Sequence, residues 1–295
     1  MEKIIELYKK NRVDYDSLPI ELCKVDRSRV HVLVVIGVRD RDRFIKPVLE
    51  SLFVADEFLG AMAERFWSVS YIVVEHTHAP KHKQVCSELG IDYVWLKCNK
   101  GEPFNRSLAF NVGYLCGDDC DWVLTHDIDC MVQSDFYDKL FANIKRTGAD
   151  AIQTFANHRV IYCLEYLTDR LISGKVAANE LMEGHDGTFT APGMAMGGSI
   201  MIKSCLFERV GMYDPELFTG YAPEDQFLWH KLEVFTKVQS CDDPENNIFH
   251  LHHPFMGKTN PRLPEMNKLC QQFTASGIVT KRSIIDYKFH NNGID

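Results

Sequence analysis

Two aspartates separated by one residue follow an apolar stretch in the middle of the sequence. Asp127 and Asp129 come directly after residues 122–126, which predict a buried strand. In an open α/β sheet, ligands bind beyond the carboxyl ends of the strands. Two carboxylates placed there can approach one divalent cation, and their hard oxygen atoms suit Mn²⁺ or Mg²⁺ bound to the phosphates of a nucleotide. The alternative interpretation is a polar turn, since Asp is common in turns.

A second acidic pair, Glu224 and Asp225, precedes the apolar residues 227–229 of a predicted helix. At that position both acids could simply cap the helix and oppose its dipole. A carboxylate at a loop–helix junction could also be a general base, which takes a proton from a sugar hydroxyl within hydrogen-bond reach. Capping and catalysis are compatible, so the pair is a candidate catalytic site.

Three histidines lie in the last predicted strand, residues 246–253. If the alternation of a strand continues through this segment, His250 and His252 lie on one face and His253 lies on the other. Neutral imidazole suits Mn²⁺ better than Mg²⁺, so these histidines are candidate metal ligands. The alternative is a run of polar side chains at a strand end. A zinc site would need a further local ligand, for which the sequence offers no obvious candidate.

Two arginines, Arg39 and Arg41, follow the first apolar run of the sequence. The guanidinium group is a planar fork that suits a phosphate or the edge of a pyrimidine. The alternative is a loop of salt bridges with Asp40 and Asp42. The sequence alone does not decide between the two.

The elements that must position these residues alternate between strands and helices. In the first half, strands are predicted at 32–38, 69–75, 92–96 and 122–126, and helices at 44–65, 81–89 and 104–116. This alternation predicts an α/β fold with an open, mostly parallel sheet flanked by helices, which is a nucleotide-binding shape. In the less regular second half, strands are predicted at 149–155, 196–202 and 246–253, and helices at 204–210 and 224–234. One domain is the simplest organisation.

Length and composition limit the class of protein. The chain has 295 residues, of which 45% are hydrophobic and 25% charged, and this excludes a disordered tail, a collagen-like fibre and a coiled coil. Its formal net charge of −8 argues against nucleic acid or an anionic membrane as a partner. Ten cysteines without a CxxC pair indicate reduced thiols. We find neither an apolar segment at the N-terminus nor a run of 18 apolar residues, and therefore expect a soluble, cytoplasmic protein. An anchored or trimmed enzyme stays open, and so does the oligomeric state.

In their order along the chain, these motifs resemble those of the inverting GT-A glycosyltransferases. The resemblance is strongest to the β-1,4-galactosyltransferase family, and extends to bacterial chondroitin polymerases and polypeptide N-acetylgalactosaminyltransferases. The animal galactosyltransferases have a Phe-Arg-Asn-Arg turn, a Phe-Asn-Arg helix start followed by Asn-Val-Gly, a His-Asp-Val-Asp metal motif, a Gly-Gly strand and a Trp-Gly-Gly-Glu-Asp-Asp loop. The corresponding residues here are 38–41, 104–106 with 111–113, 126–129, 197–198 and 221–226. The chondroitin polymerases end the site with a His followed by Gly-Lys and Asn, as in His252, Gly257, Lys258 and Asn260.

The resemblance spans roughly residues 30–262 and implies the organisation of the chain. It implies a Rossmann-like GT-A domain over 30–262, with a nucleotide-sugar half at 30–130 and an acceptor half at 131–262. Residues 1–29 are then an N-terminal helix and linker, and residues 263–295 a C-terminal extension.

The resemblance also implies roles for single residues. Val38, Arg39 and Arg41 would line the pocket for uridine and diphosphate, and Phe104 and Arg106 would support the nucleotide. Asp127 would contact the ribose or the donor sugar, Gly198 would lie close to that sugar, and Lys258 would reach the phosphates. Asp129 and His252 would ligate the metal. Asp225 would be the catalytic base, and Glu224 would hold acceptor hydroxyls.

The activity that the resemblance implies is metal-dependent inverting transfer of a sugar from a UDP-sugar to a glycan hydroxyl, with Mn²⁺ or Mg²⁺. Two departures from the family limit this. Residues 221–223 replace the Trp-Gly-Gly platform, so donor and acceptor identities are not carried over, and Leu251 offers no sulfur where the animal enzymes have a Met ligand. His250, or water, could supply the further ligand. A nucleotidyltransferase is one alternative, although residues 37–41 are poor in the glycine that its phosphate loop needs. A catalytically silent carbohydrate-binding module is the other.

Overall fold

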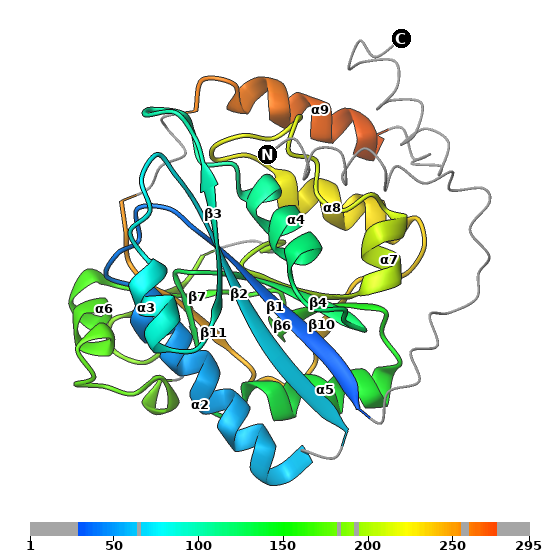
Figure 1. Ribbon diagram of the computed structural model, residues 1–295. Helices are drawn as coiled ribbons and strands as arrows, with labels where there is room; N and C mark the ends of the chain where they lie inside the picture. The colour runs from blue at the N-terminus through cyan, green and yellow to red at the C-terminus, as the bar shows by residue number, and fades with distance from the viewer. Residues whose placement is uncertain (1–28, 64–65, 182–183, 192–194, 255–259, 276–295) are drawn as a thin grey trace.

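The central feature of the fold is a seven-stranded sheet with helices on both faces (Figure 1). The computed structural model describes residues 29–63, 66–181, 184–191, 195–254 and 260–275. The strands of this sheet are β1 (Val30–Val38), β2 (Trp67–Thr77), β3 (Asp92–Lys97), β4 (Trp122–Asp127), β6 (Ala151–Ala156), β9 (Ser199–Lys203) and β10 (Gln239–Cys241). Their order is β10-β6-β9-β4-β1-β2-β3, and β9 alone among them is antiparallel to its neighbours. The prediction of a mostly parallel sheet is therefore confirmed.

A smaller, four-stranded sheet lies beside the first, in the order β5-β11-β7-β8. Its strands are β5 (Cys130–Val132), β7 (Ile161–Cys163), β8 (Thr188–Thr190) and β11 (Ile248–His250). Three of these strands were not expected, because three residues are too few to show an alternating pattern. The strand expected over 246–253 is shorter than predicted, because β11 ends at His250. His252 and His253 therefore lie beyond the end of the strand.

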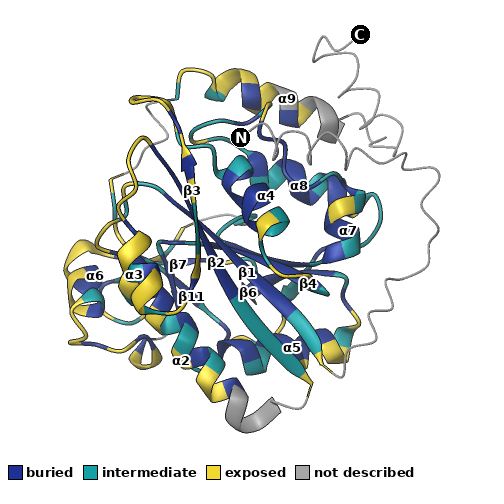
Figure 2. Cartoon of the chain, in the orientation of Figure 1, coloured by how far each residue is buried: buried dark blue, intermediate teal, exposed yellow. Residues whose placement is uncertain are grey.

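Helices cover the two faces of the large sheet as two groups. The group on one face is α2 (Ile45–Ala63) and α5 (Phe136–Thr147), and the group on the other is α4 (Arg106–Cys116), α7 (Ser204–Arg209) and α8 (Glu224–Glu233). The remaining helices are α3 (Lys83–Glu88), α6 (Glu165–Ile172), η1 (Ala178–Glu180) and α9 (Leu263–Ala275). The central strands are buried between the layers (Figure 2). No helix in the described ranges has the length and apolar character that crossing a membrane requires.

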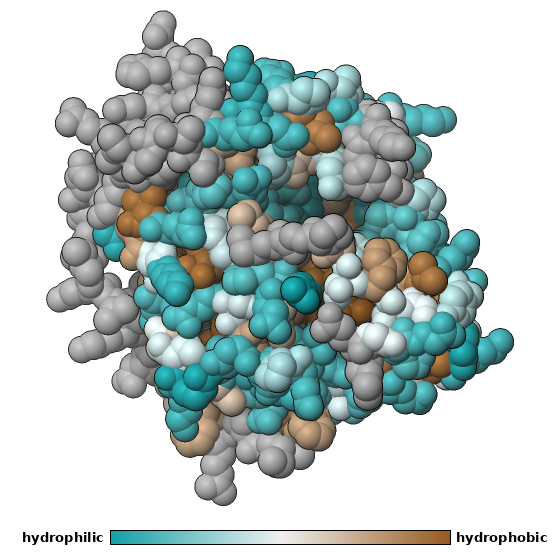
Figure 3. All heavy atoms as spheres, turned by 180° about the vertical axis from the view of Figure 1, so that it is seen from behind, coloured by the Kyte–Doolittle hydropathy of each residue, from teal (hydrophilic) through white to brown (hydrophobic). Residues whose placement is uncertain are grey.

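Two structural expectations concern the ends of the chain. The helix expected at the N-terminus falls within residues 1–28, which lie outside the described residues. Within residues 263–295, which were expected to form a C-terminal extension, α9 places Met266 and Cys270 against Phe218 and Phe227, and thereby packs on α8. The face seen from behind is mostly hydrophilic, with small separate apolar groups (Figure 3).

Helix α4 lies close to the sheet, and its first residue, Arg106, projects into the site described below. Asn105 caps the helix by accepting a hydrogen bond from the backbone N–H of Leu108 at 2.9 Å. Gly113 lets the helix approach β1, since a methyl group there would collide with the side chain of Val35. The cap and the glycine together fix the height of Arg106 above the sheet.

A buried ion pair holds α8 to the loop before it. Lys231 is 1% exposed and its Nζ lies 2.5 Å from Oδ2 of Asp214, while Nζ also donates to the carbonyl of Met212. We expect Lys231→Met to lower the free energy of unfolding by about 3–5 kcal/mol, because it leaves the Asp214 carboxylate buried without its ammonium. Urea unfolding measures this loss. Lys203→Met removes a more exposed pair with Asp150 and should cost at most about 1 kcal/mol; equal losses in the two variants would contradict the prediction.

Candidate functional site

The site lies at the carboxyl end of β4, where the fold class predicts a ligand. His126 is fully buried there, with Nδ1 2.9 Å from Oγ of Ser199 and Nε2 2.8 Å from the carbonyl of Cys130. Burial lowers the pKa of His126 to about 4, so this imidazole is neutral. Both ring nitrogens are engaged by the fold, and His126 therefore holds the turn that carries Asp127 and Asp129.

Asp129 lies in a cluster with two histidines of the C-terminal half. Nε2 of His253 is 3.0 Å from Oδ2 of Asp129, and Nε2 of His250 is 3.7 Å from Oδ1. Each of the three residues offers one ligand atom, and these three atoms lie within 4.8 Å of one another. One carboxylate and two imidazoles form a mixed oxygen–nitrogen set, which fits a borderline divalent cation such as Mn²⁺.

The placement of His252 differs from the expectation that it would be the metal histidine. The side chain of His252 is exposed, and its backbone N–H donates to Oγ1 of Thr168 at 2.8 Å. The alternation argument fails because β11 ends at His250, so the following residues no longer alternate as in a strand. Beyond this end, the N–H of Leu251 donates to the carbonyl of Asp129 at 2.7 Å. The side chain of His253 then lies against the carboxylate of Asp129.

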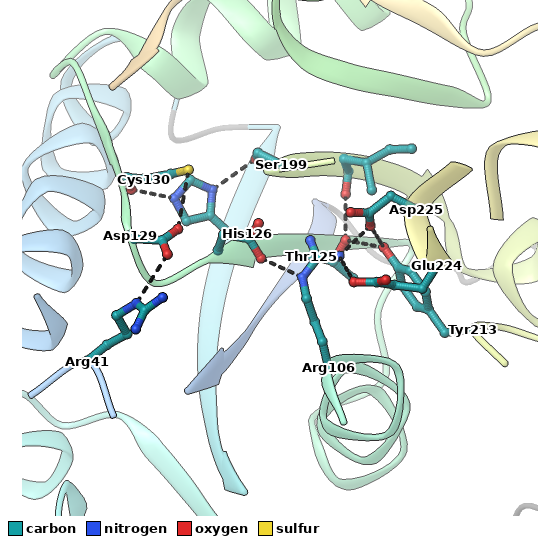
Figure 4. A network of polar contacts seen from close by, with 12 residues as sticks. Arg41, Arg106, Thr125, His126, Asp129, Cys130, Ser199, Tyr213, Glu224 and Asp225 are labelled. Atoms are coloured by element: carbon teal, nitrogen blue, oxygen red, sulfur yellow. Dashed lines mark hydrogen bonds and ion pairs between the residues drawn. The ribbon is translucent and has the colours of Figure 1, made fainter. Parts of the chain in front are cut away.

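Arg41 adds a positive charge to this cluster. Its Nε lies 3.4 Å from Oδ2 of Asp129 (Figure 4). Its NH2 lies 3.1 Å from Nδ1 of His253. Burial alone would raise the pKa of Asp129, but the hydrogen bond with His253 and the charges of His250, His253 and Arg41 hold that pKa well below its usual range. Asp129 is therefore an ionised carboxylate, as a metal ligand must be.

Arg106 forms the second half of the site, on the other side of the β4 end (Figure 4). Its Nε is 2.6 Å from Oδ1 of Asp127, and its NH1 is 2.5 Å from Oδ1 of Asp225 and 3.1 Å from Oε1 of Glu224. The guanidinium also lies 4.6 Å from the ring centre of Phe110. Arg106 was expected to support the nucleotide, whereas in the structure it joins three carboxylates from β4 and α8.

Two of these carboxylates hold protons more tightly than usual. Burial, and then the charge of Asp225, raise the pKa of Glu224 to about 8. Burial also raises the pKa of Asp127 to about 7, with Arg106 opposing and the charges of Asp129 and Asp225 adding to the rise. Oε2 of Glu224 is buried and has no hydrogen-bond partner among the described residues. A buried oxygen left in this state is suited to bind a polar group of a ligand.

Arg39, Phe104 and His76 lie together at the carboxyl ends of β1 and β2. The side chain of Arg39 is 16% exposed, and its NH1 is buried without a hydrogen-bond partner in the described part of the chain. His76 accepts a hydrogen bond from the N–H of Asn105 at 3.1 Å, and its ring is 6.0 Å from that of Phe104. Burial and the charge of Arg39 lower the pKa of His76. His76 was not a candidate site residue in the sequence, where its one signal is its position directly after a predicted strand. Val38, which was a candidate, is buried at the end of β1.

The glycine pair that leads into β9 lies between the two halves. Gly198 has φ +96, and its carbonyl accepts a hydrogen bond from the N–H of Asp127 at 2.8 Å. Gly197 faces the acidic pair of α8, because a methyl group on it would collide with the carboxylate of Asp225. The structure therefore brings Asp127, Gly198 and Asp225 together. Lys258 lies outside the described residues.

Comparison with known proteins identifies the fold. No protein-family model matches the sequence, and a search of curated protein sequences found no match either. Among solved structures, S. aureus TarS 1–349 in complex with UDP-GlcNAc matches with a TM-score of 0.56 and 12% identity, over 90% of this chain and 74% of that chain. The same protein in complex with UDP matches with a TM-score of 0.55 and 14% identity, over 90% and 74% of the two chains.

A further match is a mutant of the Drosophila β-1,4-galactosyltransferase 7 in complex with manganese, UDP-Gal and xylobiose, with a TM-score of 0.46 and 13% identity over 76% of this chain and 71% of that chain. At such identities a structural likeness concerns the fold and not the activity. The order of the large sheet and the likeness to TarS together show that this chain has the GT-A glycosyltransferase fold.

Proposed function

We propose that the protein is a metal-dependent inverting glycosyltransferase, which moves a sugar from a UDP-sugar to a hydroxyl group of a glycan. The observation that carries this proposal is the pairing of two different acidic centres at one strand end. Asp129 with His250 and His253 fits a divalent cation, and Asp225 with Glu224 lies across the end of β4 from it. A glycosyl transfer needs both a stabilised leaving group and a base for the incoming hydroxyl.

The donor half would use the cation cluster and the basic residues around it. Asp129, His250 and His253 would hold Mn²⁺, which when bound neutralises charge on the departing diphosphate. Arg41 lies against this cluster, and Arg39 keeps a buried donor without a partner in the described residues, so both are placed to bind phosphate or the pyrimidine. The likeness to the TarS complexes with UDP and UDP-GlcNAc supports a UDP-sugar donor.

The acceptor half would use the start of α8. Asp225 takes the proton of the acceptor hydroxyl as that hydroxyl attacks the anomeric carbon, through a transition state that resembles an oxocarbenium ion. Glu224, with its protonated carboxyl group and buried Oε2, holds another hydroxyl of the acceptor. Tyr221 is half exposed just before this pair and offers a ring face to a sugar.

A screen of UDP-sugars tests the proposed function. We expect Mn²⁺-dependent release of UDP from one of them, which EDTA abolishes and a glycan acceptor accelerates. Release of UTP that depends on pyrophosphate would instead show a nucleotidyltransferase. The absence of any turnover across UDP-galactose, UDP-N-acetylgalactosamine, UDP-glucose, UDP-N-acetylglucosamine, UDP-glucuronic acid and UDP-xylose would favour a binding module and contradict the proposal.

A further inference from the structure

The two carboxylate oxygens of Asp225 lie in unlike surroundings. Oδ1 accepts hydrogen bonds from NH1 of Arg106 at 2.5 Å and from the hydroxyl of Tyr213 at 3.3 Å (Figure 4). Oδ2 accepts no hydrogen bond from any residue that the structure describes. The donors on Oδ1 fix the rotation of the carboxylate group, since a charged donor and a hydroxyl both hold the same atom. The lone pairs of Oδ2 are then the ones available to an incoming hydroxyl.

Gly197 provides the space that Oδ2 occupies. An ideal Cβ on Gly197 would overlap Oδ2 and would lie 2.8 Å from Cγ of Asp225. Gly197 does not have a positive φ, so its own backbone conformation does not require glycine. The requirement comes from the carboxylate of Asp225, because the three heavy atoms nearest to that Cβ all belong to Asp225.

The neighbouring contacts place Oδ2 beside the end of β4. Gly198, the next residue, accepts the N–H of Asp127 at 2.8 Å, so Oδ2 lies beside the strand end that carries Asp127 and Asp129. Tyr213 itself is buried at 1% exposure, and the hydroxyl of Tyr213 lies 3.2 Å from Oγ1 of Thr125 on β4. The rotation of the Asp225 carboxylate is thus tied to the same strand as the cation cluster.

We propose that Oδ2 of Asp225 is the atom that receives the acceptor proton, and that Arg106, Tyr213 and Gly197 are positioning residues that select it. This inference rests on the proposed glycosyl transfer. The O–H bond of the acceptor breaks and its proton passes to Oδ2. An electron pair of the hydroxyl oxygen forms the new bond to the anomeric carbon. The bond between that carbon and the diphosphate oxygen breaks, and its electron pair leaves with UDP.

The first test is Gly197→Ala, measured with the UDP-sugar and the acceptor that the screen identifies. We expect kcat of transfer to fall by at least about 10²-fold, the lower end of what a general base contributes. The KM for the UDP-sugar and the Mn²⁺-dependent affinity for UDP should stay within about 2-fold of wild type, because the three heavy atoms nearest to the added methyl group all belong to Asp225. Gly90→Ala, on the turn before β3, is the control: the added methyl group has open space, its cost is the backbone strain of alanine at φ +68, and kcat should be kept.

A double-mutant cycle separates displacement of the base from general damage. In an Asp225→Ala background, Gly197→Ala should lower the residual rate by less than about 3-fold, since the group it displaces is already gone. If Gly197→Ala instead costs as much in that background as in wild type, the inference is wrong.

Tyr213→Phe tests the same inference where Gly197→Ala does not fold. Loss of one hydrogen bond to Oδ1 should lower kcat by about 2- to 10-fold. The control is Tyr114→Phe: Tyr114 lies in the last turn of α4 and loses a hydrogen bond to Glu208 of α7, and this variant should keep kcat. Wild-type kcat in both Gly197→Ala and Tyr213→Phe would overturn the inference while leaving the proposed function intact. A wild-type protein that releases no UDP from any UDP-sugar would overturn both.

Discussion

Replacement of Asp225 by Asn is expected to lower turnover by at least about 10²-fold and to leave binding of the UDP-sugar unchanged. The amide oxygen can still accept the hydrogen bonds that Arg106 and Tyr213 make to Oδ1, so the surrounding structure is kept. The amide cannot take a proton from the acceptor hydroxyl, and a positioned general base contributes about 10²–10⁴-fold to rate. The loss should therefore fall on kcat, with little change in the KM of the donor.

Single-turnover assays with and without the acceptor, together with calorimetry of UDP binding, would measure these two effects separately. Asp92→Asn is a matched control, because Asp92 is an exposed carboxylate at the start of β3. Transfer at the wild-type rate by Asp225→Asn would remove Asp225 from the role of base. Loss of UDP affinity in the same variant would show that the substitution disturbs the donor half.

The fold could be predicted from the sequence where elements are long and apolar. Strands such as β1 and β2 contain apolar runs rich in β-branched residues, so both their type and their order are visible locally. The three-residue strands β5, β7, β8 and β10 were not visible in the sequence. They owe their existence to pairing with distant strands, as β7 pairs with β11.

The acidic residues of the candidate site could be singled out from the sequence, whereas the contacts between them could not. Asp127 and Asp225 stand at element ends, a position that sequence patterns reveal. The bridge that Arg106 makes to them joins residues 21 and 119 positions apart, and no local pattern records it. The choice of His253 over His252 depends on where β11 ends, which is the least certain part of any prediction from sequence.

Charged side chains are distributed differently in the two parts of the site. Burial, and in second place the negative charge of three carboxylates around one guanidinium, raise the pKa of Asp127 to about 7 and that of Glu224 to about 8. The cation cluster shows the opposite arrangement, in which Arg41 and two imidazoles surround a single carboxylate. At this one strand end the pKa values of Asp127 and Glu224 are raised, whereas the pKa of Asp129 is lowered.

Asp129→Ala is the second substitution with a large expected effect, and it acts on binding. Loss of a group that only hydrogen-bonds to a metal ligand typically lowers metal affinity by about 10–100-fold. Asp129 is the one carboxylate in the cluster and would bind the metal directly, so its loss should weaken Mn²⁺ binding by at least about 10²-fold. UDP affinity should then lose its dependence on Mn²⁺, because the cation would bridge the protein and the diphosphate. Calorimetric titrations of UDP with and without Mn²⁺ measure this directly. Unchanged Mn²⁺-dependent affinity would refute the assignment of Asp129 as a ligand.

The two neighbouring histidines make this test specific to geometry. His253→Ala should weaken Mn²⁺-dependent UDP binding as Asp129→Ala does, since Nε2 of His253 lies 3.0 Å from that carboxylate. His252→Ala is the matched control: its side chain is exposed and it joins the fold through its backbone N–H, which the substitution retains. If His252→Ala loses affinity and His253→Ala does not, the metal follows the family pattern rather than this structure, and the cluster of Asp129, His250 and His253 is not the cation site.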